Sequence, residues 1–490
     1  MKVRISYPPI ENEKGIPLLS QNRQFQWFSV PTYIYPMVPA YAATLLSEAG
    51  HDVIWDDAIA EEKTYNEWIY EVEADQPGVM MIETKTPVVK THWHIIDDIK
   101  RISPVTNVVI VGDHVTALPH ESMKMSKVDY VLTGGDYDFL LVNLVDYLSE
   151  KTEVLEPGVW YRKNGDIKTT GDFTLNHNLN DLPFIDRDLT KWHLYAYKNG
   201  NFKITPGTYT MVGRDCWWRN DDGCTFCSWP TLYPAWRVRR PELLVNEIGM
   251  LIEKYGVREV FDDTGTFPVG RWLSKFCQLM IDRGYNEDIS FSCNMRFGTL
   301  IFDDYLLMKK AGFRMLLHGL ESANQMTLDL LNKGLKRKDI LDGCRMARKA
   351  DLEPHITIMV GYPWETKNDA LNTLKLGKML MEKGWATTLQ ATIITPYPGT
   401  KIYDEALRNG WFSVDPYDYD RFDMNEPVLK TPDMEPEDIV RLCDEIYKIF
   451  LSPMYMLNRL LRTRSLSDLM YYFRGSMKVL GHVKDFARRK

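Results

Sequence analysis

The sequence contains little cysteine and no apolar run at its start. It has seven cysteines among 490 residues, an odd number. The first residues, MKVRISYPPIENEKG, include no apolar stretch long enough for a signal peptide or a membrane span. A disulfide framework is not expected, because disulfides belong mainly to exported chains and pair cysteines evenly. We therefore expect a protein of the reducing cytoplasm, where clustered cysteines bind metal or take part in chemistry.

The sequence also lacks an excess of positive charge. Its 59 Lys and Arg residues are outnumbered by 67 Asp and Glu, which gives a net charge of −8. A general nucleic-acid binder is not expected, since phosphate contacts need a basic face. The composition, with 44% hydrophobic and 26% charged residues, is that of a soluble globular protein. The length is too great for one ordinary core and predicts two or three domains.

The first 150 residues alternate short apolar segments with segments of helical periodicity. Strands are predicted at 2–9, 52–57, 79–84, 107–114 and 129–135, and helices at 36–49, 88–102 and 138–150. This alternation predicts a doubly wound, Rossmann-like parallel sheet, an α/β fold that binds ligands at the carboxyl ends of its strands.

Several residues at those predicted strand ends are candidate ligand contacts. Each residue taken singly is better explained as part of a tight turn. Only the group as a whole predicts a ligand site. They are Pro9, Thr84, Thr86, Gly112, Asp113, His114, Gly134 and Gly135.

The rest of the chain predicts a connector, a barrel and a helical end. Residues 151–204 form the connector, with a hairpin around Asn164-Gly165. From 205 to 402, six strand-helix units indicate a partial (β/α)6 barrel, whose chemistry would lie at the carboxyl ends of the strands. Residues 403–490 are expected to be mostly helical.

Three of the seven cysteines lie in "RDCWWRNDDGCTFCSWP", just after the first barrel strand. Structural zinc would need four ligands, usually two C-x₂-C knuckles, and only one knuckle is present. A disulfide is disfavoured by the compartment, and three unrelated core cysteines would not suit this polar segment. A [4Fe–4S] cluster held by Cys216, Cys224 and Cys227, with one iron open to a small molecule, explains the pattern best. Cys277, Cys293 and Cys344 are expected to be small core residues.

With this cysteine segment the chain resembles radical S-adenosylmethionine (SAM) enzymes that carry an N-terminal cobalamin-binding domain (class B radical SAM methyltransferase-like). Their common motif is C-x₃-C-x₂-C with an aromatic residue before the last cysteine. Cys224-Thr-Phe226-Cys227 matches, but the first gap holds seven residues. The cluster loop therefore carries an insertion of four residues, which costs little closure entropy in a flexible loop.

Further segments resemble the family in the same order along the chain: "EVFDDTG", "LLHGLES", "MVGYPWET" and "TPYPGT". The resemblance implies a set of SAM contacts, which are Phe226, Asp262, Asp263, Glu321, Ser322, Gly361, Glu365 and Thr395. Alternatives stay open for some of them, since Asp262 and Asp263 could form a helix cap and a turn, and Glu321 could be a structural ion pair. His318 is as well explained by a buried core histidine.

The resemblance also implies the chemistry. SAM chelates the open iron, and one electron cleaves it to a 5′-deoxyadenosyl radical that abstracts hydrogen from an unactivated carbon. The strand-end residues of the first domain would then bind cobalamin, although no D-x-H-x-x-G signature is present and the domain could instead keep the fold without the cofactor. The function expected is cobalamin-dependent methylation of an unactivated carbon. Radical cyclisation, ring contraction or C–C bond formation without methyl transfer is the alternative, and an iron–sulfur sensor or carrier is the alternative from another class.

Partners follow less directly. The resemblance implies a reducing protein such as flavodoxin or ferredoxin, and the substrate could be a lipid, a tetrapyrrole or a natural-product precursor. From Asn458 onward the chain has nine Lys or Arg and two Asp with apolar residues between them. Such a segment predicts either peripheral membrane contact or a solvated helix that closes the barrel.

Overall fold

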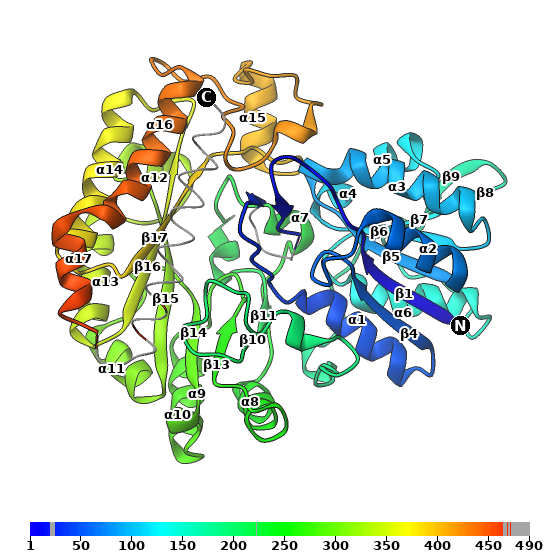
Figure 1. The fold of residues 1–490 in the computed structure, drawn as a ribbon, viewed down its shortest axis with the longest axis horizontal. Coiled ribbons are helices and arrows are strands. Elements are labelled where there is room, and N and C mark those ends of the chain that lie inside the picture. The colour runs from blue at the N-terminus through cyan, green and yellow to red at the C-terminus, as the bar shows by residue number, and fades with distance from the viewer. Residues whose placement is uncertain (20–24, 222, 464–467, 469–470, 472–490) are drawn as a thin grey trace.

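The computed structural model describes residues 1–19, 25–221, 223–463, 468 and 471. It contains two large sheets, each in its own layer of helices, that lie side by side (Figure 1). In the described part of the chain, no helix is long and apolar enough to cross a membrane.

The N-terminal sheet has seven strands in the order β4-β1-β5-β6-β7-β8-β9. The first five are parallel, and β8 and β9 add an antiparallel hairpin at the edge. This is a flavodoxin-like order whose direction reverses between β1 and β5. The strands are β1 (Lys2–Tyr7), β4 (Asp52–Asp57), β5 (Val79–Glu83), β6 (Asn107–Val111), β7 (Tyr130–Leu132), β8 (Val159–Lys163) and β9 (Asp166–Thr169).

Helices cover both faces of this sheet. One core contains residues of α1 and α6, and a second core on the other face contains residues of α2, α3 and α5. The helices are α1 (Met37–Glu48), α2 (Tyr65–Asp75), α3 (Val89–Ile102), α4 (Asp113–Ala117), α5 (Pro119–Met125) and α6 (Tyr137–Leu148). The doubly wound prediction is confirmed. The hairpin at Asn164-Gly165 is also present, with positive φ at both residues, but it extends the sheet rather than standing apart in a connector.

The second sheet has six parallel strands in chain order and curves into an open barrel. All six predicted strands are found, within a few residues of the predicted ends. The strands are β10 (Gly207–Thr210), β13 (Glu259–Asp262), β14 (Ser290–Met295), β15 (Phe313–Glu321), β16 (Glu353–Val360) and β17 (Thr388–Ile393).

Helices surround the barrel strands on the outside (Figure 1). They are α8 (Pro241–Tyr255), α9 (Arg271–Asp282), α10 (Tyr285–Asp288), α11 (Phe302–Lys310), α12 (Gln325–Leu330), α13 (Arg337–Lys349) and α14 (Lys367–Glu382). The C-terminal region continues with α15 (Lys401–Asn409), α16 (Pro436–Tyr447) and α17 (Pro453–Leu460). α16 packs against β17 and α14, which completes the helical layer beside the last strand.

The described residues also contain shorter elements. They are β2 (Ile16–Pro17) with β3 (Trp27–Phe28), β11 (Gly213–Arg214) with β12 (Arg237–Val238), the short helix α7 (Trp229–Leu232) and six 3₁₀ helices. The 3₁₀ helices are η1 (Thr86–Val88), η2 (Leu179–Asp181), η3 (Trp192–Leu194), η4 (Trp217–Asp221), η5 (Tyr419–Arg421) and η6 (Lys448–Leu451).

A buried ion network joins the N-terminal sheet to the barrel at this junction. The Arg214 guanidinium donates to Asp136 at 2.7 Å and also pairs with Asp138, both at the start of α6. Arg237, on the paired strand β12, donates to Asp136 at 2.5 Å. Because Arg214 lies two residues before Cys216, this network fixes the start of the cysteine loop against the first domain.

Candidate active site

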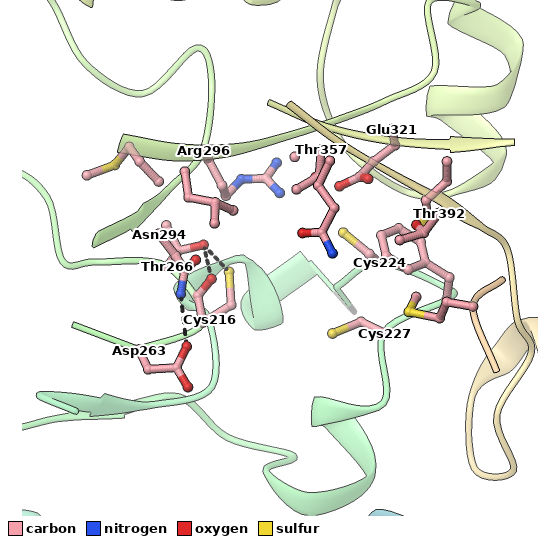
Figure 2. A pocket seen from close by; sticks show the side chains of 18 of the residues that line it. Cys216, Cys224, Cys227, Asp263, Thr266, Asn294, Arg296, Glu321, Thr357 and Thr392 are labelled. Atoms are coloured by element: carbon pink, nitrogen blue, oxygen red, sulfur yellow. Dashed lines mark hydrogen bonds between the residues drawn. The ribbon is translucent and has the colours of Figure 1, made fainter. Parts of the chain in front are cut away.

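The three predicted cluster cysteines lie around one cavity. Cys216, Cys224 and Cys227 are partly buried and line a cavity of about 210 Å³ at the carboxyl ends of the barrel strands (Figure 2). Within the described residues, no three His, Cys, Asp or Glu side chains converge tightly enough to hold a single metal ion. Figure 2 shows Cys216 on one side of this space and Cys224 and Cys227 on the other.

The loop that carries the cysteines lies close to the turn that follows β13. Asp215, with φ at 73°, precedes the first cysteine, and a Cβ at Gly265 would lie 2.8 Å from the Asp215 carbonyl oxygen. Glycine therefore permits this close approach. The Cys216 thiol contacts Thr266 Oγ1 at 3.0 Å, and the Arg219 guanidinium donates to Asp215 at 2.6 Å.

The four-residue insertion folds into η4 and docks on the loop after α12. Trp218 Nε1 donates to the Asn332 carbonyl at 2.8 Å, and Asn332 Nδ2 donates to the Gly223 carbonyl at 2.8 Å. The Arg296 guanidinium lies 4.2 Å from the centre of the Trp218 ring. A Cβ at Gly334 would lie 2.1 Å from that ring, so glycine makes room for the indole. The insertion is therefore an ordered part of the cavity wall.

Cations surround the cysteine thiols. Burial raises the pKa of the Cys224 thiol, while Lys333 and Arg296 oppose this rise. Lys333 Nζ donates to Glu321 Oε1 at 2.7 Å. Burial alone would lower the pKa of Lys333, but the Glu321 carboxylate and the nearby Cys224 raise it. These cations favour the thiolate form, which is the form that binds iron.

The predicted SAM contacts divide into two groups. Four line the cavity, and four lie in the surrounding walls. The cavity group is Phe226, Asp263, Glu321 and Thr395, and the wall group is Asp262, Ser322, Gly361 and Glu365.

The wall group makes internal hydrogen bonds. Asp262 accepts from Thr210 Oγ1 at 2.9 Å and from the Val212 backbone at 3.0 Å, and its burial raises its pKa to about 7. Glu365 accepts from Ser322 Oγ and from Thr327 Oγ1, each at 2.6 Å. These two carboxylates therefore hold the strand ends by internal hydrogen bonds and do not line the cavity.

The open alternatives for other residues are resolved by their surroundings. Glu321 is both salt-bridged and at the cavity. His318 is a core residue, because its ring stacks on Phe297 at 4.2 Å and burial lowers its pKa to about 3. Cys277, Cys293 and Cys344 are buried, as predicted.

The strand-end residues of the first domain do not line the cavity. Thr84 Oγ1 contacts His92 Nδ1 at 2.7 Å. His114 contacts Thr86 Oγ1 at 3.1 Å and meets the Tyr419 ring edge-on.

The glycines at these strand ends are also covered by protein atoms. A Cβ would lie 2.4 Å from the Phe173 ring at Gly134, and 1.8 Å from the Tyr233 ring at Gly135. A Cβ at Gly112 would lie 2.2 Å from the Thr84 carbonyl oxygen. Pro9 and Asp113 are buried as well. Protein groups therefore lie against each of these strand-end glycines.

The first domain reaches the cavity through a different segment. Leu18, Phe28, Thr32 and Ile34 line its mouth. Sequence reasoning missed them because they lie between β1 and α1, outside the predicted strand ends. Three of the four are apolar, so this wall of the cavity is mostly apolar.

Other cavity residues were also missed. Figure 2 shows Thr266, Asn294, Arg296, Thr357 and Thr392 pointing into the same space as the cysteines. All five lie in or just after barrel strands. Their position at the ends of barrel strands could have predicted them. Sequence reasoning considered only the strand-end residues that the family motifs contain.

A doubly wound domain, an open six-stranded parallel barrel and three cysteines after its first strand together define a radical SAM enzyme with the architecture of the cobalamin-binding members. Residues 211–377 match the model of the Radical SAM superfamily, so this part of the chain is a radical SAM domain. The radical SAM fold implies a [4Fe–4S] cluster and SAM as cofactors.

Known proteins resemble the chain over most of its length. It is 26% identical to an uncharacterized methyltransferase of Pyrococcus horikoshii, over 85% of this chain and 87% of that one. It is 25% identical to the anaerobic magnesium-protoporphyrin IX monomethyl ester cyclase of Cereibacter sphaeroides, over 81% of this chain but only 63% of the cyclase. Among solved structures, the radical SAM methyltransferase TsrM from Kitasatospora setae, with cobalamin and a [4Fe–4S] cluster bound, superposes with a TM-score of 0.69 at 14% identity, over 99% of both chains.

Proposed function

We propose that this enzyme methylates an unactivated carbon of a small molecule or lipid with cobalamin as the methyl carrier. The observation that carries the proposal is the composition of the cavity. The barrel side contributes three thiols and the carboxylates of Asp263 and Glu321, and the first domain contributes Leu18, Phe28 and Ile34. A cobalamin-binding relative of the same fold and a relative named as a methyltransferase support it.

Each group of residues has a task in this proposal. Cys216, Cys224 and Cys227 would hold the cluster, and its open iron would take the amino and carboxylate groups of SAM. Asp263 and Glu321 would bind the rest of SAM by charge-assisted hydrogen bonds. The aromatic and apolar walls would keep water away from a radical.

Cobalamin, when bound, supplies a methyl group that can be passed to the activated carbon. The apolar mouth formed by Leu18, Phe28 and Ile34 fits the face of a corrin ring. The strand-end glycines of the first domain, in contrast, contact the Phe173 and Tyr233 rings and the Thr84 backbone. We therefore place the corrin contact at the mouth.

A second candidate is radical cyclisation without methyl transfer. The relative named as a cyclase favours it, because that likeness also covers most of this chain. Both candidates use the same cluster and the same SAM contacts. They differ in what happens to the methyl group of SAM, and that difference can be measured.

The distinguishing experiment follows both products of SAM. The protein is purified with added hydroxocobalamin, reconstituted anaerobically, reduced with flavodoxin or ferredoxin, and supplied with lipid, tetrapyrrole and natural-product precursors. A methyltransferase yields S-adenosylhomocysteine and 5′-deoxyadenosine in near-equal amounts, and its product gains one methyl mass. 5′-Deoxyadenosine without matching S-adenosylhomocysteine would favour the cyclase. A protein that binds no hydroxocobalamin would contradict the methyl carrier.

A further inference from the structure

Arg296, directly after the third barrel strand β14, is a buried cation to which the proposed function gives no task. The residue is 6% exposed and lines the cavity, and Figure 2 shows its side chain pointing into the space between the cysteines. Its Nη2 atom donates to the Lys333 carbonyl. Its Nε atom is buried and has no hydrogen-bond partner in the part of the chain that the structure describes.

The charge of Arg296 is not balanced by a protein carboxylate. Among the described residues, Glu321 on the neighbouring strand pairs with Lys333 at 2.7 Å, and no carboxylate pairs with Arg296. Arg296 also opposes the rise in the pKa of Lys333, because the two positive charges repel each other. A buried charge without a counter-charge is costly. Such a cation is therefore expected where a ligand supplies the negative charge.

The inserted turn η4 holds this guanidinium in place. The guanidinium lies 4.2 Å from the centre of the Trp218 ring and 5.6 Å from that of Trp217. Trp218 is itself fixed, since its Nε1 atom donates to the Asn332 carbonyl at 2.8 Å. An indole face attracts a cation but does not accept the in-plane hydrogen bonds of a guanidinium. The rings therefore position Arg296 and leave N–H groups for a ligand.

We infer that Arg296 binds a carboxylate of a small molecule in the cavity, and that the inserted turn positions Arg296 through Trp218. The planar fork of a guanidinium matches a carboxylate with two parallel N–H···O bonds. The carboxylate belongs either to SAM or to the substrate, since both would occupy this cavity. The inference rests on the proposed function only in that SAM binds here, which both candidate reactions share.

The competing explanation is that Arg296 serves the cluster. Both cations lower the pKa of the Cys224 thiol, but Lys333 does so more strongly than Arg296. Lys333 is thus the main cation beside this thiol, and Arg296 remains available to a ligand. The two explanations differ in what Arg296 recognises, and the experiments below measure that recognition directly.

The first experiment uses two probes, SAM and decarboxylated SAM, which differ only in the carboxylate. Isothermal titration of the anaerobically reconstituted protein measures both affinities. If SAM supplies the carboxylate, Arg296→Gln should weaken SAM binding about tenfold to a hundredfold and leave the affinity for decarboxylated SAM unchanged. If Arg296→Gln loses iron, Arg296→Lys takes its place. The lysine keeps the charge but not the fork, and it should lose part of the preference for SAM.

The second experiment tests the substrate as the source. The probes are protoporphyrin IX and its dimethyl ester, which differ only in their carboxyl groups, added to the SAM-bound protein. A tetrapyrrole is chosen because a relative is named for a protoporphyrin ester. If the substrate supplies the carboxylate, the wild type should prefer the free acid, and Arg296→Gln should lose that preference while its SAM affinity stays unchanged. Absorbance titration measures the binding.

Matched variants separate recognition from stability. Arg345→Gln is the control, because Arg345 also lies over a tryptophan, 5.3 Å from the Trp385 ring, but its side chain is 60% exposed on α13. It should bind all probes like the wild type. Trp218→Leu should reduce the preference for the carboxylate probe, and Trp218→Phe should retain most of it. A purely structural role for Trp218 would weaken both probes of a pair equally.

The outcomes are distinct. The inference is overturned if Arg296→Gln, with about four irons per chain, keeps the wild-type preference in both experiments. A changed reduction potential of the cluster together with unchanged preferences would assign Arg296 to the cluster, which also overturns it. Wild-type protein that holds its cluster but binds neither SAM nor decarboxylated SAM would contradict the proposed function itself, and the inference with it.

Discussion

At the scale of single residues, Asp262 and Asp263 are neighbours in the sequence but have different surroundings. Asp263 lines the cavity, while Asp262 accepts hydrogen bonds inside the barrel wall. Successive side chains at a strand end point to opposite sides of the sheet. A sequence motif that contains both carboxylates therefore does not identify which of them contacts the ligand.

We predict that Asp263→Asn and Glu321→Gln weaken SAM binding about ten- to a hundredfold, because each removes a charge-assisted hydrogen bond of roughly 1.5–3 kcal/mol. Iron content should not change. Isothermal titration of the anaerobically reconstituted protein measures the affinity. Asp262→Asn is the matched control, and it should lower the melting temperature while SAM affinity stays near that of the wild type. The reverse pattern would assign the ligand contact to Asp262.

The cysteines give a second prediction at this scale. Cys216→Ala, Cys224→Ala or Cys227→Ala should each abolish the cluster, leaving far fewer than the about four irons per chain of the wild type. Cys277→Ala and Cys344→Ala should keep full iron, because both thiols are buried, and burial raises the pKa of Cys277 to about 12. Iron and sulfide analysis after anaerobic reconstitution measures this. A complete cluster in the Cys216 variant would show that another residue supplies the ligand.

At the scale of elements, the inserted turn η4 explains how a longer cysteine loop can still hold a cluster. Trp218 places the turn against the loop after α12, between the Arg296 guanidinium and Gly334. The same loop carries Lys333, which pairs with Glu321 at the cavity. Because one loop contacts both the cysteine segment and a SAM-side carboxylate, displacement of η4 should affect both.

Gly334→Ala tests this coupling. The new Cβ would collide with the Trp218 ring at 2.1 Å, so η4 should be displaced and the cluster should be lost faster to an iron chelator. Gly256→Ala is the control, since its φ of 61° is close to the 57° of Gly334 but nothing lies within 4 Å of its Cβ. Both variants carry the cost of a side chain at positive φ, about 1 kcal/mol. Equal rates of cluster loss, followed by visible absorbance, would refute a role for the docked turn.

At the scale of the whole molecule, the junction between the two halves is electrostatic. Arg214 and Arg237 of the barrel side meet Asp136 and Asp138 of the first domain, and His177 lies between Asp136 at 3.3 Å and Glu156 at 3.1 Å. Burial opposes the charged form of His177, but the two carboxylates outweigh it and raise its pKa to about 9.

This junction predicts a pH dependence of stability. Because the folded-state pKa of His177 lies above its ordinary value of 6.5, its stabilising contribution is complete below pH 6.5 and is lost as the pH rises through about 9. The melting temperature of the wild type should therefore fall by about 2–4 °C more than that of His177→Gln between pH 6.5 and pH 9.5. His193→Gln, at an exposed position, should behave like the wild type. Identical pH profiles for wild type and His177→Gln would exclude this ion pair as a stabilising contact.

The sequence alone determined both sheets, the order of their strands along the chain and the three cysteines of the cluster loop. These features depend on local periodicity and on spacing within a short segment, so they can be read without knowing which residues meet in space. The helix α2, with its Thr64 capping box, was missed although its signal is also local.

Only the tertiary structure decided which motif residues face the cavity and what fills the strand ends. Asp262, Ser322 and Glu365 turned out to be wall residues, and Phe173, Tyr233 and Tyr419 cover the turns expected to bind cobalamin. The mouth residues Leu18, Phe28, Thr32 and Ile34 also appeared only in three dimensions. The physical reason is that burial and contact depend on residues far apart in the chain, whereas periodicity records only the order of neighbours.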